Sequence, residues 1–156
     1  MDINSETFYL YQIAEVNLPK KRMSISNLNA KDYKFVNEKC IDENIHRITK
    51  SFKENDIKLE KDIPIIEKGD IILPLKQDFR STKLSIALVQ ENSIMLSDNF
   101  AIIKAKEKSS SEKILSLFEN EFVISQIKPL YTGKDYFNIT INEINNIQIP
   151  IEFIND

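Results

Sequence analysis

The chain of 156 residues is long enough for one domain with a hydrophobic core, and its 42% apolar and 29% charged residues are ordinary for a globular protein. Its 21 basic and 24 acidic side chains give a net charge of −3, whereas nucleic-acid binders are more often basic overall. A single cysteine, Cys40, excludes an internal disulfide, and a single histidine, His46, excludes a zinc site of the usual His/Cys kind. No apolar stretch approaches the roughly 20 residues of a membrane-spanning helix, and residues 1–6 lack the features of a signal peptide. We therefore expect a cytoplasmic protein that does not contact a membrane.

The first apolar segment, residues 8–16, is short. It predicts either a strand or a turn of helix that packs Leu10, Ile13 and Val16 inward. Pro19 ends this segment, because proline restricts the residue before it and cannot donate a backbone hydrogen bond.

The next segments are weaker until residue 63. Residues 33–36 predict a strand. Residues 39–62 are dense in charge and poorly periodic, which indicates a loop with a possible strand at 45–52.

A Gly69-Asp70 turn opens the clearest β region of the sequence. Residues 70–74 form an apolar run directly after it, which predicts a buried strand. Three more short runs rich in β-forming residues predict further strands at 85–89, 94–96 and 100–105.

The hydrophobic period then changes to that of a helix. Ser109 is followed three residues later by Glu112, the pattern of a capping box, and an apolar stripe continues to Ile127. Pro129 marks the end, so one main amphipathic helix is predicted over about 112–128.

The C-terminal region predicts a second, shorter helix and a strand. Thr140 and Glu143 form another capping box, which opens a helix of little more than one turn. Residues 147–151 return to strand spacing, and Pro150 indicates an edge position or a strand end. Several strands with one main helix between them predict a single α+β domain over residues 1–156 with a mixed sheet.

Residue patterns that are typical of catalytic sites are few in this sequence. Two glycines, 64 residues apart, cannot form a phosphate-binding loop of the P-loop or Rossmann kind. His46 lies in a charge-rich segment without a nucleophile pattern, and carboxylate pairs such as Asp56 and Glu60 are expected by chance on a solvated surface. The sequence therefore predicts neither an enzyme nor a catalytic, metal or cofactor site.

Basic side chains, in contrast, are clustered. One group follows the first apolar segment, a second surrounds Arg47, a third occupies the polar loop after residue 74, and one lysine stands in a late turn. Lysine and arginine neutralise DNA phosphates, and arginine, asparagine and glutamine can read base edges. The candidate DNA-binding residues are Lys20, Lys21, Arg22, Lys76, Arg80, Lys83 and Lys134.

Four motifs in order resemble the target recognition domain of type I restriction-modification specificity subunits. The resemblance covers residues 8–153. It rests on an opening Leu-x-x-Ile-Ala-x-Val-like run, a central Gly-Asp-Ile strand, a helix before a short glycine turn, and a closing stretch of alternating isoleucines; these correspond here to residues 10–16, 66–72, 111–134 and 138–151.

This resemblance implies sequence-specific binding of double-stranded DNA without catalysis. In the family such a domain positions a methyltransferase complex, so methyltransferase (modification) and restriction subunits are the implied protein partners. Complete specificity subunits carry two such domains joined by long helices, whereas the motifs here account for one. We therefore expect a stand-alone or split specificity domain.

Two other functions stay open at this point. The same fold could serve as a protein-interaction or regulatory module that does not bind DNA directly, with the acidic residues 135–156 adding to a partner. The chain could also be an unrelated enzyme or binding domain, which a deep pocket lined by convergent carboxylates would indicate.

Overall fold

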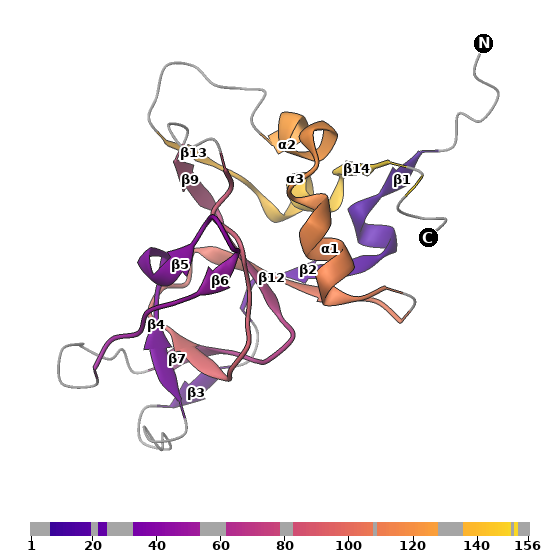
Figure 1. Ribbon diagram of the computed structural model, residues 1–156. Coiled ribbons are helices and arrows are strands. Elements are labelled where there is room, and N and C mark those ends of the chain that lie inside the picture. Colours follow the sequence, from indigo (N-terminus) through magenta and orange to yellow (C-terminus); the bar gives the residue numbers. More distant parts are fainter. Residues whose placement is uncertain are drawn as a thin grey trace, which may run out of the picture.

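The computed structural model describes most of the chain, and every sheet and helix given below is built from the described residues, which are 7–19, 22–24, 33–53, 62–78, 83–107, 109–127, 136–150 and 152. The fold is α+β, as predicted, and consists mainly of strands (Figure 1). Among these residues no helix is long and apolar enough to cross a membrane.

The largest sheet is mixed and six-stranded. Its β10–β6 pair is parallel, and its other pairs are antiparallel. From one edge to the other the strands are β2 (Ala14–Asn17), β12 (Phe100–Ala105), β8 (Ile71–Pro74), β10 (Ala87–Leu88), β6 (Arg47–Ile48) and β5 (Ile41–Asp42).

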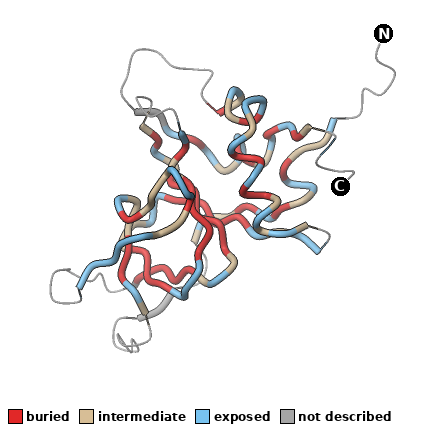
Figure 2. Tube along the Cα trace, viewed as in Figure 1, coloured by how far each residue is buried: buried red, intermediate tan, exposed pale blue. Residues whose placement is uncertain are grey.

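The centre of this sheet is buried on both faces, which explains the unbroken apolar run of β8. Ile71 and Leu73 pack into one hydrophobic cluster, and Ile72 between them packs into another. Successive side chains of a strand point to opposite faces, so a strand covered on both sides needs apolar residues at every position. Full burial of each such side chain contributes about 1.5–3 kcal/mol. Figure 2 shows the buried residues concentrated in these central strands.

A four-stranded sheet covers one face. Its side chains Val36, Ile66 and Met95 pack against Ile72 and Phe100 of the larger sheet. The β11–β4 pair is parallel, and β7 pairs antiparallel with both β11 and β3. The strands in order are β3 (Arg22–Ser24), β7 (Asp62–Ile66), β11 (Ser93–Met95) and β4 (Lys34–Val36).

The helices, together with the first and last strands of the fold, cover the other face. Buried residues of all three helices pack in one cluster with β8 and β12. A two-stranded sheet of β1 and β14 lies beside them, and a 3-10 helix, η1, connects β1 to β2. The bounds are α1 (Ser111–Leu117), α2 (Glu121–Ile127), α3 (Ile141–Asn145), β1 (Phe8–Tyr9), η1 (Leu10–Gln12) and β14 (Gln148–Ile149).

The Gly-Asp turn predicted from the sequence joins β7 to β8. Gly69 has φ of 95°, a conformation that glycine adopts without the steric cost that a side chain adds. The buried Asp70 carboxylate accepts a hydrogen bond from the Glu67 backbone N–H (2.9 Å) and pairs with the Lys104 ammonium (2.5 Å). Both residues of the turn are thus required by its geometry.

The predicted helix over 112–128 is in fact two helices. The α1 helix ends at Leu117, and α2 begins at Glu121. The Asn120 side chain accepts hydrogen bonds from the backbone N–H groups of Phe122 and Val123, which is how an N-cap residue starts a helix. The apolar stripe continues across the break, so the hydrophobic pattern did not reveal it.

The predicted cap of this region is displaced by one residue. Ser110, not Ser109, is the N-cap of α1, and its hydroxyl accepts a hydrogen bond from the Lys113 N–H. The second capping box is confirmed, because Thr140 and Glu143 each bond to the other's backbone N–H at the start of α3.

Of the other segments, the strands predicted at 33–36, 85–89, 100–105 and 147–151 are present with shorter or equal bounds, and the strand predicted at 94–96 is present one residue earlier. The first segment combines both predicted alternatives, since β1 and β2 flank η1. The possible strand at 45–52 is present as the short β6, and the rest of the predicted loop up to residue 53 includes β5 and the end of a 3-10 helix, η4 (Glu38–Cys40). The strands β3, β7, β9 (Lys76–Asp78) and β13 (Tyr136–Asn138) were not predicted.

Candidate nucleic-acid interface

A two-stranded ribbon of β9 and β13 extends from the end of β8. The polar loop predicted after residue 74 begins here with Lys76, which pairs with Asn138, and the register continues to Asp78, which pairs with Tyr136. Lys76 and Asn138 are exposed, and Asp78 is half-buried. In Figure 1 the ribbon lies at the upper left of the fold, away from β3 and β7. The structure thus joins two segments about 60 residues apart in sequence.

Gln77 anchors this ribbon to the body of the fold. Its side chain is 1% exposed. Its Nε2 donates to the backbone oxygens of Pro74 (2.7 Å) and Ser85 (2.9 Å), and its Oε1 accepts from the Ser85 N–H (2.8 Å). Buried polar groups are costly to leave without partners, so these three bonds hold β9 in one position against the segment that follows it.

Backbone hydrogen bonds hold the base of the ribbon as well. The Ile139 N–H donates to the Leu75 oxygen at 2.7 Å, and the Leu75 N–H donates to the Asn99 oxygen at 3.0 Å. Leu75, which precedes β9, is therefore bonded both to the residue that follows β13 and to the residue that precedes β12.

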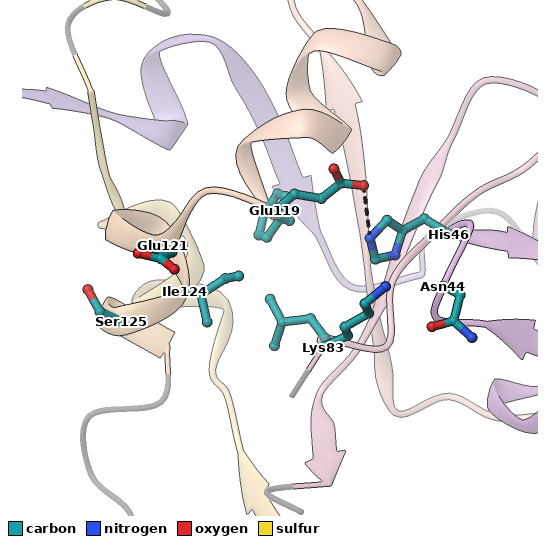
Figure 3. Close-up of a pocket in the computed structure, with 9 residues that line it drawn as sticks. Asn44, His46, Lys83, Glu119, Glu121, Ile124 and Ser125 are labelled. Carbon is teal, nitrogen blue, oxygen red and sulfur yellow. Dashed lines mark ion pairs between the residues drawn. The ribbon is translucent and has the colours of Figure 1, made fainter. Parts of the chain in front are cut away.

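Lys83 lies at a hollow of about 560 Å³ between the helices and the β5–β6 turn. In Figure 3, Asn44, His46 and Lys83 line one side, and Glu121 and Ser125 line the other. Two carboxylates, Glu119 and Glu121, contribute to the lining. A phosphate inside the hollow would face negative charge, so Lys83 could contact DNA only from the rim.

His46 is held rigidly beside this hollow. It is buried, its backbone φ is 54°, and its ring nitrogens lie 3.3 Å from the Ile86 oxygen and 3.2 Å from the Glu119 carboxylate. Each contact joins the β5–β6 turn to another element, so the histidine links these parts of the fold. Within the described residues no cluster of three or more His, Cys, Asp or Glu side chains could hold a metal ion.

Three of the seven predicted DNA-binding residues lie on described backbone. Lys76 is on the ribbon, Lys83 is at the rim of the hollow, and Arg22 is in β3 of the four-stranded sheet. Figure 1 separates β3, at the bottom, from the ribbon, so Arg22 is not brought beside Lys76. The others lie outside the described residues; they are Lys20, Lys21, Arg80 and Lys134.

In the basic cluster around Arg47, one side chain is engaged in contacts within the protein. The Arg47 guanidinium pairs with the Glu112 carboxylate at 3.0 Å and donates to the His46 oxygen at 3.0 Å. Lys50 and Lys53 are exposed. Arg47 therefore ties β6 to α1, and this structural contact accounts for its position.

Sequence reasoning missed two residues of the ribbon. These are Gln77 and Asn138, neither of which is a candidate on sequence grounds. A glutamine flanked by charged residues gives no sign of burial, and an isolated asparagine gives no sign of its partner strand. Only the pairing of β9 with β13 identifies them.

Comparison with known proteins places this geometry in context. No family model matches the sequence, and no curated protein matches it. Solved structures do match. A chain from a structure of the type I restriction-modification system, determined to explain complex assembly and conformational transition, aligns with a TM-score of 0.64 and 21% identity. The HsdS subunit from Thermoanaerobacter tengcongensis aligns with a TM-score of 0.63 and 20% identity. The type I S subunit from M. genitalium aligns with a TM-score of 0.53 and 10% identity.

These alignments cover 93%, 96% and 96% of this chain but only 37%, 39% and 36% of the matched chains. This chain therefore spans less than two fifths of their length. At such identities the likeness concerns the fold: the chain has the α+β fold of one part of a type I specificity subunit. The resemblance to a target recognition domain, inferred from four sequence motifs, is confirmed at this level.

Proposed function

We propose that this chain binds double-stranded DNA in a sequence-specific manner, as a stand-alone or split target recognition domain of a restriction-modification system. The observation that carries the proposal is the fold, which aligns over 93% and 96% of the chain with chains from type I systems. The sequence motifs and the three-dimensional shape lead to the same class of protein.

The proposed role is recognition without catalysis or cofactors. The domain would place a methyltransferase subunit over its target base, with modification and restriction subunits as protein partners. The His46 ring lies between the Glu119 carboxylate and the Ile86 oxygen, so it links the β5–β6 turn to two other parts of the fold.

Phosphate contacts are assigned first to Lys76 and Lys83. Both are exposed, and they lie at opposite ends of the segment that begins with β9. Arg80 lies between them in the sequence, and Lys134 is two residues before β13. Lys20, Lys21 and Arg22 remain candidates for a separate contact, because β3 lies at another end of the fold.

The test is a fluorescence anisotropy titration of the full chain with a labelled random duplex of about 30 base pairs. Counterion release predicts that log K falls linearly with log salt, with a slope of about −0.9 for each neutralised phosphate. The double variant Lys76→Ala/Lys83→Ala should reduce the slope by about 1 to 2 and weaken binding. Lys34→Ala removes an exposed lysine on β4, where it pairs with Glu91, and serves as the control.

Absence of binding at about 50 mM salt, where electrostatic binding is strong, would overturn the proposal. An unchanged slope in the double variant, with binding intact, would instead move the phosphate contacts to other residues.

A second candidate function is a protein-interaction module with the same fold. The observation in its favour is the exposure of two large aromatic side chains, Tyr11 (46%) and Phe122 (47%), on the helical side of the fold. This function predicts that a methyltransferase subunit is retained in a pull-down by the Lys76→Ala/Lys83→Ala variant, while the unaltered chain binds no DNA.

A further inference from the structure

We propose that the β9–β13 ribbon enters the DNA major groove and that Asn138 is a specificity-determining residue that reads a base edge. This inference rests on the proposed DNA-binding function and adds to it the element, the groove and the residue. It depends on the register and exposure of the ribbon.

The ribbon has an inner and an outer face. Gln77 points into the fold and is buried, so its neighbours Lys76 and Asp78 face outward, since side chains alternate along a strand. Asn138 lies directly opposite Lys76, and opposed residues of an antiparallel pair project from the same face. Lys76, Asp78 and Asn138 therefore share the outer face.

This face carries a group that can read a base edge beside a lysine that can contact a phosphate. Asparagine can form two hydrogen bonds with adenine, and Lys76, which lies opposite Asn138, can contact the adjacent backbone. Asn138 is exposed, and its side chain makes no hydrogen bond within the part of the chain that the structure describes, so its amide can meet a base.

The dimensions of the ribbon also fit. The major groove admits a two-stranded β-ribbon. Lys76 and Asp78 are two residues apart, which is about 7 Å along a strand and corresponds to about two base-pair steps. The Cβ atoms of an opposed pair such as Lys76 and Asn138 are about 5 Å apart. The outer face can therefore address two or three consecutive base pairs.

The anchoring of the ribbon favours discrimination between bases. The three hydrogen bonds of Gln77 and the Ile139–Leu75 backbone bond fix the strand positions before DNA binds. A reading group held in place loses little conformational freedom on binding, so a mismatch cannot be relieved by movement of the ribbon.

The test is a selection of bound sequences from a pool of randomised duplexes with the full chain and with Asn138→Ala. The unaltered chain should enrich a consensus, and the variant should lose preference at one base pair by about tenfold, with the rest of the consensus retained. The salt slope should not change, because Asn138 carries no charge. Asn138→Asp, which replaces the amide donor by an acceptor, should shift the preferred base at the same position.

Asn92→Ala is the control for an exposed asparagine away from the ribbon. Asn92 belongs to the connection between β10 and β11, where its Oδ1 accepts a hydrogen bond from the Lys68 N–H at 3.0 Å. Thermal melting of each variant verifies that the fold is intact. If the unaltered chain enriches no consensus, the proposed function fails and this inference with it. If a consensus appears and Asn138→Ala and Asn138→Asp leave it unchanged, or Asn92→Ala alters it equally, DNA recognition stands and base reading by the ribbon is overturned.

Discussion

Replacement of Gln77 by leucine should lower the free energy of unfolding by about 3 kcal/mol. Leucine has a similar volume, so the change removes hydrogen bonds without opening a large cavity. Three bonds are lost, two from Nε2 to the oxygens of Pro74 and Ser85 and one from the Ser85 N–H to Oε1. Each bond contributes about 1 kcal/mol net. Gln77 is only 1% exposed, so water cannot readily replace it as the partner of the backbone groups that leucine leaves without a hydrogen bond.

The loss is large relative to the total stability of a domain, which is about 5–15 kcal/mol. For a chain of this size it corresponds to a fall in melting temperature of about 6–12 °C. Urea unfolding followed by circular dichroism measures the free energy, and thermal melting supplies a second estimate. Gln90→Leu is the control, because Gln90 is exposed and its replacement should change stability by less than about 0.5 kcal/mol.

A loss below about 1 kcal/mol for Gln77→Leu would refute this reasoning. It would mean that the three bonds contribute no net stability and that the ribbon is not anchored by them. The rigidity on which base reading depends would then need another source.

Three further substitutions test local features of the fold, each by urea unfolding. Gly69→Ala should cost about 1–2 kcal/mol through backbone strain alone, since φ is 95° and a Cβ would meet no atom within 4 Å; a neutral result would show that the turn adapts. Thr140→Ala should cost about 1 kcal/mol by removing the cap of α3, and Thr140→Ser should restore most of it. Asn120→Ala should cost a similar amount, whereas a gain in stability would mean that α1 and α2 can merge into one helix.

Features set by neighbours in the chain were predictable. The cap of α3 needs only Thr140 and Glu143 at the correct spacing, and both bonds form as expected. The Gly69-Asp70 turn and the strand after it follow from one flexible residue and a run of apolar ones. These signals are short-range, because the groups that define the cap and the turn, such as Thr140 with Glu143 and Asp70 with the Glu67 N–H, lie three residues apart.

Where several neighbouring residues could each have started a helix, contacts with distant parts of the chain determined which one does. Ser109, Ser110 and Ser111 could each have capped the helix. The Ser111 hydroxyl donates to the Gly69 oxygen at 2.7 Å, which holds Ser111 as the first helical residue and leaves Ser110 as the cap. Asn120 could have continued a helix or started one, and here its side chain starts α2.

The candidate site shows the same limit more strongly. The sequence indicated basic clusters but not their arrangement: Arg47 is paired with Glu112, Arg22 lies in β3, and Lys76 lies on the ribbon. Asn138, which we propose as the base-reading residue, had no distinguishing context in the sequence. Its position opposite Lys76 exists only in the folded chain.

By itself, the sequence determined the class of fold, about half of the strands, the helical character of residues 112–127 and the motifs that resemble a target recognition domain, because hydrophobic period, caps and turns act between residues close along the chain. The tertiary structure alone decided which strands pair, which charges are taken up in structural contacts, and which polar side chains share an outer face. These depend on contacts between segments tens of residues apart, and no local pattern encodes which distant segment will become the neighbour.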